Sequence, residues 1–186
     1  QSPDTITTPN EERESYITTD TWNRAVAQLN NAHHRSVVSA RSIRNQRGRR
    51  FRDFITQTQL NRATVVVVGC GAGGRSLAMC LASMGVNHFV LIDHDKVDPI
   101  NLGTQGWSEG EIGDTKVDAL AHTVLQQNRQ ARILRLSRKW DPNLHYELQH
   151  GLMPSLSPRR HVWMLCVDSI DTRRAIGERL CAGTRR

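Results

Sequence analysis

The chain has 186 residues, 38% of them hydrophobic, with a net charge of +7 and a pI of about 9.9. This length fits one domain of ordinary size plus an extension. No apolar run approaches the roughly 20 residues that span a bilayer, and no signal-peptide pattern opens the sequence. We therefore expect no membrane segment.

In chain order the sequence divides into three regions. Residues 1–40 form a polar extension expected to contain one short helix, and residues 41–62 form a basic, helical lead-in. Residues 63–186 carry the alternating pattern of a nucleotide-binding domain. The sequence starts with Gln1, and its last residues follow a helical pattern with no closing strand. We expect a fragment of a longer protein, with this domain incomplete at its carboxy terminus.

The positive charge is concentrated before the folded region. The stretch from Arg24 to Arg62 carries nine arginines and a single acid, Asp53. Such a stretch is typical of a nucleic-acid or phosphate surface, and also of a solvated helix face. No aromatic stacking platform accompanies the arginines, so we favour the solvated face and expect no nucleic-acid partner.

Four short runs predict strands, and the first of them is almost entirely valine. The expected strands span residues 64–68, 88–92, 131–136 and 162–167. Helical patterns stand between them, although residues 138–160 contain prolines and follow no clear period. Strands that alternate with helices predict an α/β fold, with a Rossmann-like, doubly wound, mainly parallel sheet.

Three helices are expected in this domain. The first should end at Gly85, and the second should be capped by Asp114. Each has an apolar stripe that we expect to face the sheet. The stripes consist of Leu77, Cys80, Leu81 and Met84; of Val117, Leu120, Ala121, Val124 and Leu125; and of Ala175, Ile176 and Leu180.

The four cysteines are scattered along the chain, at Cys70, Cys80, Cys166 and Cys181. None forms a CxxC pair, so zinc is not supported within this sequence. Cys70 lies in a glycine-rich turn and the other three lie on strand or helix patterns that should bury them. We expect inert, reduced thiols and a cytoplasmic protein.

A glycine motif follows the first expected strand, in the sequence Gly69-Cys70-Gly71-Ala72-Gly73-Gly74. In a strand–turn–helix context, Gly69 allows the tight turn, Gly71 lets the backbone approach a phosphate, and Gly74 lets the helix pack closely. Asp93 ends the second strand, where an acid accepts hydrogen bonds from ribose hydroxyls. These features alone fit NAD and ATP equally well.

The next stretch separates the two ligands. The sequence Asp93-His94-Asp95-Lys96-Val97-Asp98-Pro99-Ile100-Asn101-Leu102-Gly103-Thr104-Gln105, then Ile112-Gly113-Asp114-Thr115-Lys116, resembles the ThiF/MoeB/HesA family. Cys166-Val167-Asp168 through Arg173 resembles a later motif of that family. The family comprises the bacterial relatives of ubiquitin-activating enzymes.

The resemblance implies an ATP-dependent adenylyltransferase. Its substrate would be the carboxy-terminal carboxylate of a small ubiquitin-like or sulfur-carrier protein, which attacks the α-phosphate of ATP. Dimers are common in the family, so a homodimer is a further expectation. Two rival interpretations remain: an NAD-dependent oxidoreductase, and a nucleotide-binding module that has lost catalysis.

The resemblance also implies roles for single residues. Gly69, Gly71 and Gly74 would face the nucleotide, Asp93 would hold the ribose, and Asn101 and Gln105 would contact the nucleotide. Lys116 would neutralise phosphate charge, and Asp168 would bind Mg²⁺.

One residue departs from the family pattern, because Thr104 stands where the family has an arginine. Threonine cannot replace the bidentate grip of a guanidinium on phosphate. Arg75, directly after the glycine turn, is our candidate for the missing catalytic cation. The arginines between Arg41 and Arg52 are the alternative donors.

Overall fold

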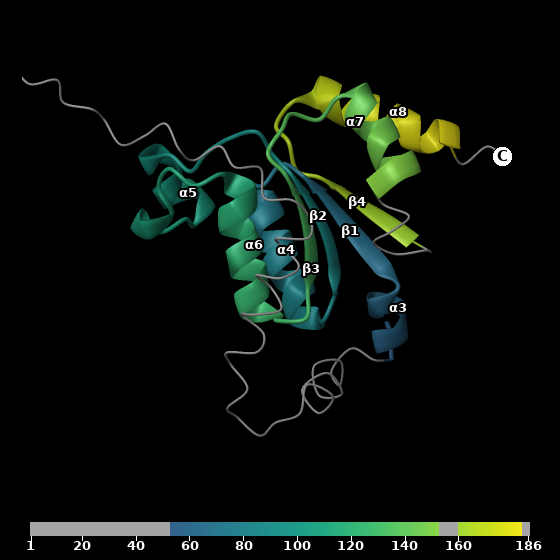
Figure 1. The fold of residues 1–186 in the computed structure, drawn as a ribbon, viewed down its shortest axis with the longest axis horizontal. Coiled ribbons are helices and arrows are strands. Elements are labelled where there is room, and N and C mark those ends of the chain that lie inside the picture. Colours follow the sequence, from purple (N-terminus) through teal and green to yellow (C-terminus); the bar gives the residue numbers. More distant parts are fainter. Residues whose placement is uncertain (1–52, 153–159, 184–186) are drawn as a thin grey trace, which may run out of the picture. The chain divides into compact units, whose positions relative to one another are not determined.

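The computed structural model describes residues 53–152 and 160–183 (Figure 1). The expected polar extension and the basic run up to residue 52 lie outside the described residues. Residues 138–160, for which the sequence showed no clear period, are described except for residues 153–159. No helix in the described ranges is long and apolar enough to cross a membrane.

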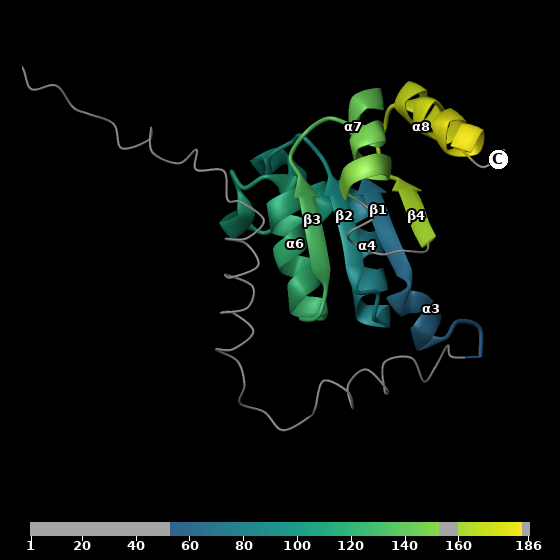
Figure 2. The ribbon, with the colours of Figure 1, turned by 45° about the vertical axis from the view of Figure 1, so that its right-hand side comes forward.

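Four parallel strands form one sheet: β1 (Ala63–Val68), β2 (His88–Ile92), β3 (Arg132–Leu136) and β4 (Arg160–Leu165). Their order is β3-β2-β1-β4, and every neighbouring pair is parallel (Figure 2). The chain therefore winds outward from β1 to β3 and then returns to the other side of β1. The strand order reverses between β1 and β4, and ligands of open α/β sheets bind at such a switch point.

Strand β1 lies inside the sheet, and both of its faces are apolar. Val65 and Val67 point into one buried cluster, and Val66 and Val68 point into the other. A strand of alternating polarity could bury only one face, so the valine run correctly predicted a parallel strand covered on both sides. The expected Rossmann-like, doubly wound fold is confirmed.

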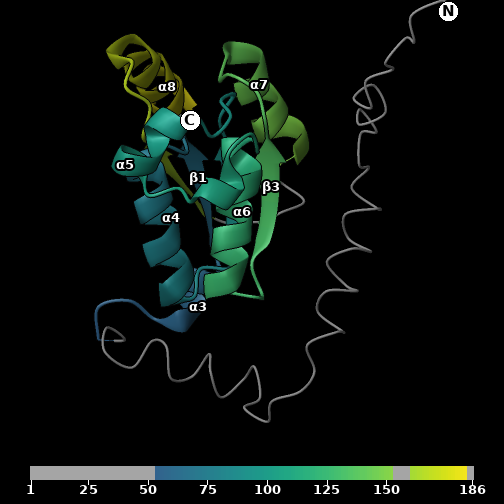
Figure 3. The same cartoon turned by 90° about the vertical axis from the view of Figure 1, so that its left-hand side faces the viewer.

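Helices α4 (Ala72–Met84) and α6 (Lys116–Gln127) cover one face of the sheet (Figure 3). The short α3 (Gln57–Asn61) lies in the expected helical lead-in. Its Leu60 packs into the hydrophobic cluster that α4 and α6 form with the sheet.

The expected buried stripe of α4 is wrong in part. Leu77 and Cys80 are exposed, and the fully buried positions are Gly74, Ala78 and Ala82. Small residues bring the helix close to the sheet, so the larger side chains are left at the rim. The helix ends at Gly85 as expected, in a left-handed conformation with φ +103°.

The buried stripe of α6 matches the sequence pattern, but its cap does not. Thr115, and not Asp114, caps the helix, and its side chain accepts a hydrogen bond from the backbone N–H of Asp118. The shift by one residue leaves Lys116 as the first residue of the helix.

Helix α7 (Pro142–Glu147), the π-helical turn η3 (Leu148–Leu152) and α8 (Ile170–Gly183) pack on the other face. The first two lie in the stretch for which the sequence showed no clear helical or strand period. Asp141 caps α7, and Pro142 is its first residue. Ile176 of α8 is fully buried, as expected. Strand β4 begins and ends two residues earlier than expected.

The long connection from β2 to α6 is structured. It contains the 3₁₀ turns η1 (Pro99–Asn101) and η2 (Glu109–Glu111) and, between them, α5 (Leu102–Gln105). An isolated bridge between Lys96 and Thr115 joins its two ends. This connection carries both Asn101 and Gln105 to the carboxyl edge of the sheet.

Candidate nucleotide-binding site

The glycine turn connects β1 to α4 at the switch point of the sheet. Gly69 has φ +94°, and a Cβ there would lie 2.8 Å from backbone atoms of Cys166 and Val167. A Cβ on Gly74 would lie 1.9 Å from the carbonyl oxygen of Gly69. Close backbone approach therefore requires glycine at both positions, which the sequence predicted for Gly74, whereas for Gly69 it predicted the tight turn.

Gly71 leaves the start of α4 open. It is the N-cap residue of the helix, and no side chain in the described residues caps α4 by a hydrogen bond. The first N–H groups of a helix have no partner within the helix and carry its positive dipole end. This turn therefore offers backbone donors to an anion.

Asp93 ties the glycine turn to the end of β2. Its Oδ2 accepts a hydrogen bond from the backbone N–H of Cys70 at 2.6 Å, and its Oδ1 accepts one from the N–H of Asp95 at 2.9 Å. The side chain is buried, so these bonds stabilise the turn strongly. Each carboxylate oxygen still has a lone pair for a ribose hydroxyl.

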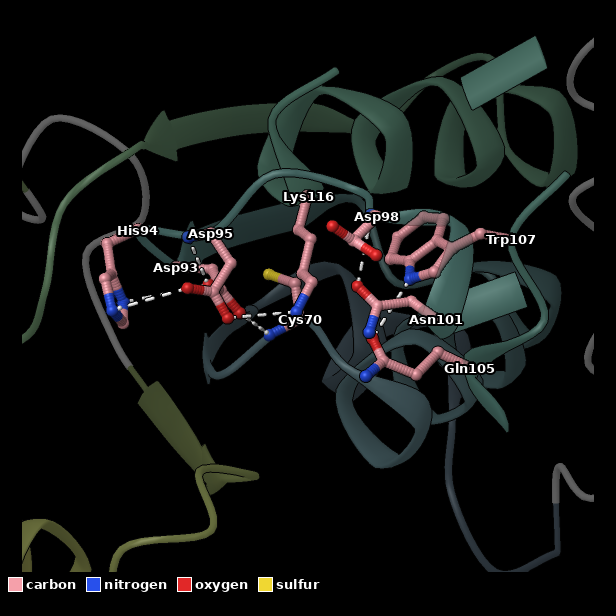
Figure 4. Close-up of polar contacts among 9 residues, drawn as sticks. All are labelled: Cys70, Asp93, His94, Asp95, Asp98, Asn101, Gln105, Trp107 and Lys116. Carbon is pink, nitrogen blue, oxygen red and sulfur yellow. Dashed lines mark hydrogen bonds and ion pairs between the residues drawn. The ribbon is translucent and has the colours of Figure 1, made fainter. Parts of the chain in front are cut away.

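Lys116 lies beside this turn and forms an ion pair with Asp95. The Nζ–Oδ2 distance is 3.0 Å; the lysine is buried, and Asp95 is about half exposed. Figure 4 shows Lys116 extending from α6 toward Asp95, next to Cys70. The structure thus brings together an ammonium group, the glycine turn and the second strand end. The pairing of Lys116 with Asp95 was not predicted from the sequence.

The environment of Cys70 suppresses its thiolate. Burial raises the pKa of this thiol well above its usual value of 9.0, and the neighbouring charge of Asp93 raises it further. Burial also raises the pKa of Cys166. The expectation that Cys80 and Cys181 are buried is wrong, because both are exposed on their helices.

The α5 connection lies against the glycine turn (Figure 4). The Oε1 atom of Gln105 lies 3.5 Å from the position that a Cβ on Gly71 would take. The same oxygen accepts a hydrogen bond from Nε1 of Trp107 at 3.1 Å. Asn101 closes a capping box with Asp98, in which its Oδ1 accepts from the Asp98 N–H at 3.2 Å.

Arg75 lies on the side of α4 that faces this connection. Its Cζ is 4.8 Å from the centroid of the Trp107 ring, in a cation–π arrangement. Thr104 is exposed. A role for Trp107 was not predicted from the sequence, although an aromatic residue after Gln105-Gly106 was the available signal. Whether Arg75 reaches a phosphate stays a prediction, and the alternative arginines lie outside the described residues.

Asp168 follows β4 at the same edge of the sheet. It is exposed, and within residues 53–152 and 160–183 it forms no hydrogen bond or ion pair. Nearby groups order the surrounding backbone: Arg173 Nε donates to the carbonyl of Val167 at 2.6 Å, and Ser169 Oγ accepts from the N–H of Thr172 at 3.2 Å. The structure does not join Asp168 to Lys116 or Asp93 by any contact among the described residues.

Two groups could hold a divalent cation. The ligand atoms of Asp93, His94 and Asp95 lie within 4.8 Å of one another. Both Asp93 oxygens already accept backbone hydrogen bonds, and Asp95 already pairs with Lys116. Asp168 offers a single exposed carboxylate, which is the hard oxygen ligand that Mg²⁺ prefers.

A parallel sheet of order β3-β2-β1-β4, with a glycine turn at the switch point, defines an α/β domain of the Rossmann-like, doubly wound class. Residues 40–185 match the model of the ThiF family, and the chain belongs to that family.

Relatives with described functions match parts of the chain. The mouse protein "Adenylyltransferase and sulfurtransferase MOCS3" is 30% identical over 123 residues, which cover 66% of this chain and 25% of that protein. "Ubiquitin-like modifier-activating enzyme 5" of Caenorhabditis briggsae is 32% identical over 75 residues, which cover 40% and 17%. The chain therefore spans a quarter or less of the length of these relatives.

Solved structures show the same fold. TcdA (CsdL) superposes with a TM-score of 0.66 at 22% identity, over 80% of this chain and 59% of that one. The crystal structure of Escherichia coli MccB with ATP gives a TM-score of 0.55 at 24% identity, over 67% and 35%.

Proposed function

We propose that this chain is the nucleotide-binding part of an ATP-dependent adenylyltransferase. The carrying observation is that the glycine turn, the buried Asp93 and the buried ammonium of Lys116 meet at the switch point of the sheet. Relatives whose names include adenylyltransferase and modifier-activating enzyme support the proposal.

The proposed reaction activates a carboxylate. An oxygen of the carboxy terminus of a small ubiquitin-like or sulfur-carrier protein forms a bond to the α-phosphorus of ATP. The bond from that phosphorus to the bridging oxygen breaks, pyrophosphate leaves with the electron pair, and an acyl-adenylate remains. Because two anions must meet, the site needs positive charge where the negative charge develops.

The described residues divide this work. The open N–H groups at the start of α4 receive phosphate oxygens, and Lys116 exchanges Asp95 for a phosphate. Asp93 accepts hydrogen bonds from the ribose, while Asn101 and Gln105 contact the nucleotide from the α5 connection. Asp168 would hold Mg²⁺, which supplies charge neutralisation at the leaving pyrophosphate.

The proposal also includes the second substrate. The carrier protein must bring its carboxylate to the carboxyl edge of the sheet, beside Asp168. A homodimer and a cytoplasmic location belong to the same proposal.

The rival function is an NAD-dependent oxidoreductase. It would leave Asn101, Lys116 and Asp168 without roles, and no observation favours it.

Thermal protection tests the choice of ligand. ATP with Mg²⁺ should raise the melting temperature of the protein and NAD should not, because a ligand that binds the folded state and not the unfolded state stabilises the fold. Equal protection by NAD would contradict the proposal. A protein that binds ATP without exchanging pyrophosphate in the presence of candidate carrier proteins would instead be the degenerate binding module.

Lys116 tests the chemistry. Lys116→Ala should slow ATP–pyrophosphate exchange by about 10²- to 10³-fold, the usual loss for one preorganised electrostatic contact. Lys139→Ala is the matched control, because Lys139 is exposed and lies outside the site. Exchange at the wild-type rate in Lys116→Ala would refute the assigned role.

A further inference from the structure

Arg75 and Trp107 form the contact that the proposed function leaves unexplained. Arg75 lies in the first turns of α4, and its guanidinium rests on the indole of Trp107, which is buried. Nε of Arg75 is buried and has no hydrogen-bond partner in the described residues, where Arg75 also forms no ion pair. The aromatic ring is therefore the principal partner of this cation.

The backbone at Gly106 makes that contact possible. Gly106 has φ +70°, and a Cβ there would lie 3.1 Å from Nη1 of Arg75. A larger residue would be strained in this conformation and would crowd the guanidinium. The turn at Gly106 therefore directs Trp107 under Arg75.

The contact continues back to the glycine turn. Trp107 Nε1 donates to Oε1 of Gln105, and the Gln105 amide lies against Gly71 (Figure 4). Arg75 and Gly71 both belong to the beginning of α4, so the chain of contacts starts and ends on the same element. It ties the α5 connection to the helix terminus that is expected to receive phosphate.

We propose that Arg75 is a positioning residue of the nucleotide site, and that it acts through Trp107 to hold Gln105 over the glycine turn. This Arg75–Trp107 clamp rests on the proposed function for its effect on ATP, but its effect on the α5 connection does not depend on any ligand.

Thr104, which stands where the family has an arginine, explains why the position of the α5 connection matters. Without an arginine, the α5 connection offers the nucleotide the uncharged amides of Asn101 and Gln105. A neutral hydrogen bond is weaker than a charge-assisted one and falls off steeply with misalignment. A loop that relies on amides therefore needs to be held in place more strictly than one that carries a cation.

Three variants separate the links of the clamp. Arg75→Met keeps an apolar stem and removes the cation. Trp107→Leu removes the ring, whereas Trp107→Phe keeps a ring for Arg75 and removes the donor to Gln105. Arg129→Ala is the matched control, because it removes an equal charge from an exposed position outside the clamp.

The first measurement is amide hydrogen exchange of residues 99–107 without ligand. Arg75→Met and Trp107→Leu should both accelerate exchange there, and Trp107→Phe should accelerate it less. Trp107 is buried, so its variants also lose global stability, and the exchange of the β1 and β2 amides is the reference against which the local change is measured. Wild-type exchange in Arg75→Met would overturn the clamp, and this result needs no ATP binding. Failure of the wild-type protein to bind ATP would refute the proposed function alone.

The second measurement is the dissociation constant of ATP with Mg²⁺ by calorimetry. A cation–π contact of ordinary strength corresponds to about a threefold to tenfold weakening in each of Arg75→Met and Trp107→Leu. Because both changes break one link, the double variant should be no weaker than the worse single variant. Additive losses would show that Arg75 contacts the nucleotide directly, and would overturn the positioning role.

Discussion

The two parts of the candidate site differ in how far the fold has already ordered them. The β1–β2 half consists of residues 69–74, residues 93–95 and Lys116, and its Asp93 and Lys116 are buried and bonded. The β4 half consists of residues 166–173, and its Asp168 is exposed and unpartnered among the described residues. Asp93 and Lys116 therefore contribute to folding, whereas the Asp168 side chain is available to ligands without contributing to stability.

The largest expected effect lies in the β1–β2 half, at Gly74. Gly74→Ala would place a Cβ 1.9 Å from the carbonyl oxygen of Gly69, so β1 and α4 would have to separate. Because backbone and not a flexible side chain must move, we expect a loss of about 3 kcal/mol or more in the free energy of unfolding. Urea denaturation measures it.

Gly73→Ala is the control for that experiment. Nothing lies within 4 Å of a Cβ at Gly73, which is in the same helix. Alanine there should leave stability unchanged or raise it, by up to about 1 kcal/mol. Similar losses in the two variants would show that close packing at Gly74 is not what the turn requires.

The next effect is expected at Asp93. Asp93→Asn replaces one of two acceptor oxygens by an NH₂ group that faces a backbone N–H. Loss of a buried, charge-assisted hydrogen bond should lower the free energy of unfolding by about 1.5–3 kcal/mol. Asp98→Asn is the matched control, since asparagine and aspartate cap helices equally well. If both variants unfold at the same urea concentration, the β1–β2 half is not preordered by Asp93.

A smaller, pH-dependent effect on the free energy of unfolding is expected at His145, which packs against β4. His145 of α7 is buried between Trp140 and Trp163 of β4. Burial lowers the pKa of this imidazole, and the charge of Arg179 lowers it further. The folded state therefore favours the neutral ring, and its contribution to stability is present above pH 6.5 and lost as the pH falls below it.

Chemical denaturation across pH measures this contribution. His145→Phe should flatten the decline in the free energy of unfolding on the acid side of pH 6.5. His88→Phe is a useful comparison, because burial lowers the pKa of His88 too, and Arg132 adds to the shift. An unchanged pH profile in His145→Phe would exclude this histidine as a source of the decline.

The smallest effect on stability is expected at Asp168, although the effect on function should be large. Asp168→Ala removes an exposed, unpartnered side chain, so the free energy of unfolding should change by less than about 0.5 kcal/mol. Pyrophosphate exchange that depends on Mg²⁺ should be abolished. Asp171→Ala is the control, because Asp171 is also exposed and belongs to the first turn of α8. A large loss of stability in Asp168→Ala would erase the contrast between the two halves.

The sequence predicted the parts of the molecule in which local pattern and final environment agree. The valines of β1, the tight turn at Gly69, the close packing at Gly74 and the apolar stripe of α6 all follow from short-range patterns. The ligand roles of the site residues remain predictions.

Other features depend on tertiary approach, which a single sequence does not display. Helix α4 buries Ala78 and Ala82 because Gly74 brings it close to β1, so its most hydrophobic stripe was the wrong guide. The contact between Arg75 and Trp107 joins segments far apart in the chain. Helix α7 was missed because its buried residues include His145, a polar type, within a short, proline-bearing segment.

The ion pair between Lys116 and Asp95 has a consequence for selectivity. The ammonium already has a counterion in Asp95, so an uncharged nucleoside, which has no group that can replace the carboxylate, leaves this pair intact and gains nothing from Lys116. A triphosphate carries enough charge to displace the carboxylate, and Asp95, about half exposed, can return to water. We therefore expect the pair to favour charged occupants, so that adenosine binds far more weakly than ATP.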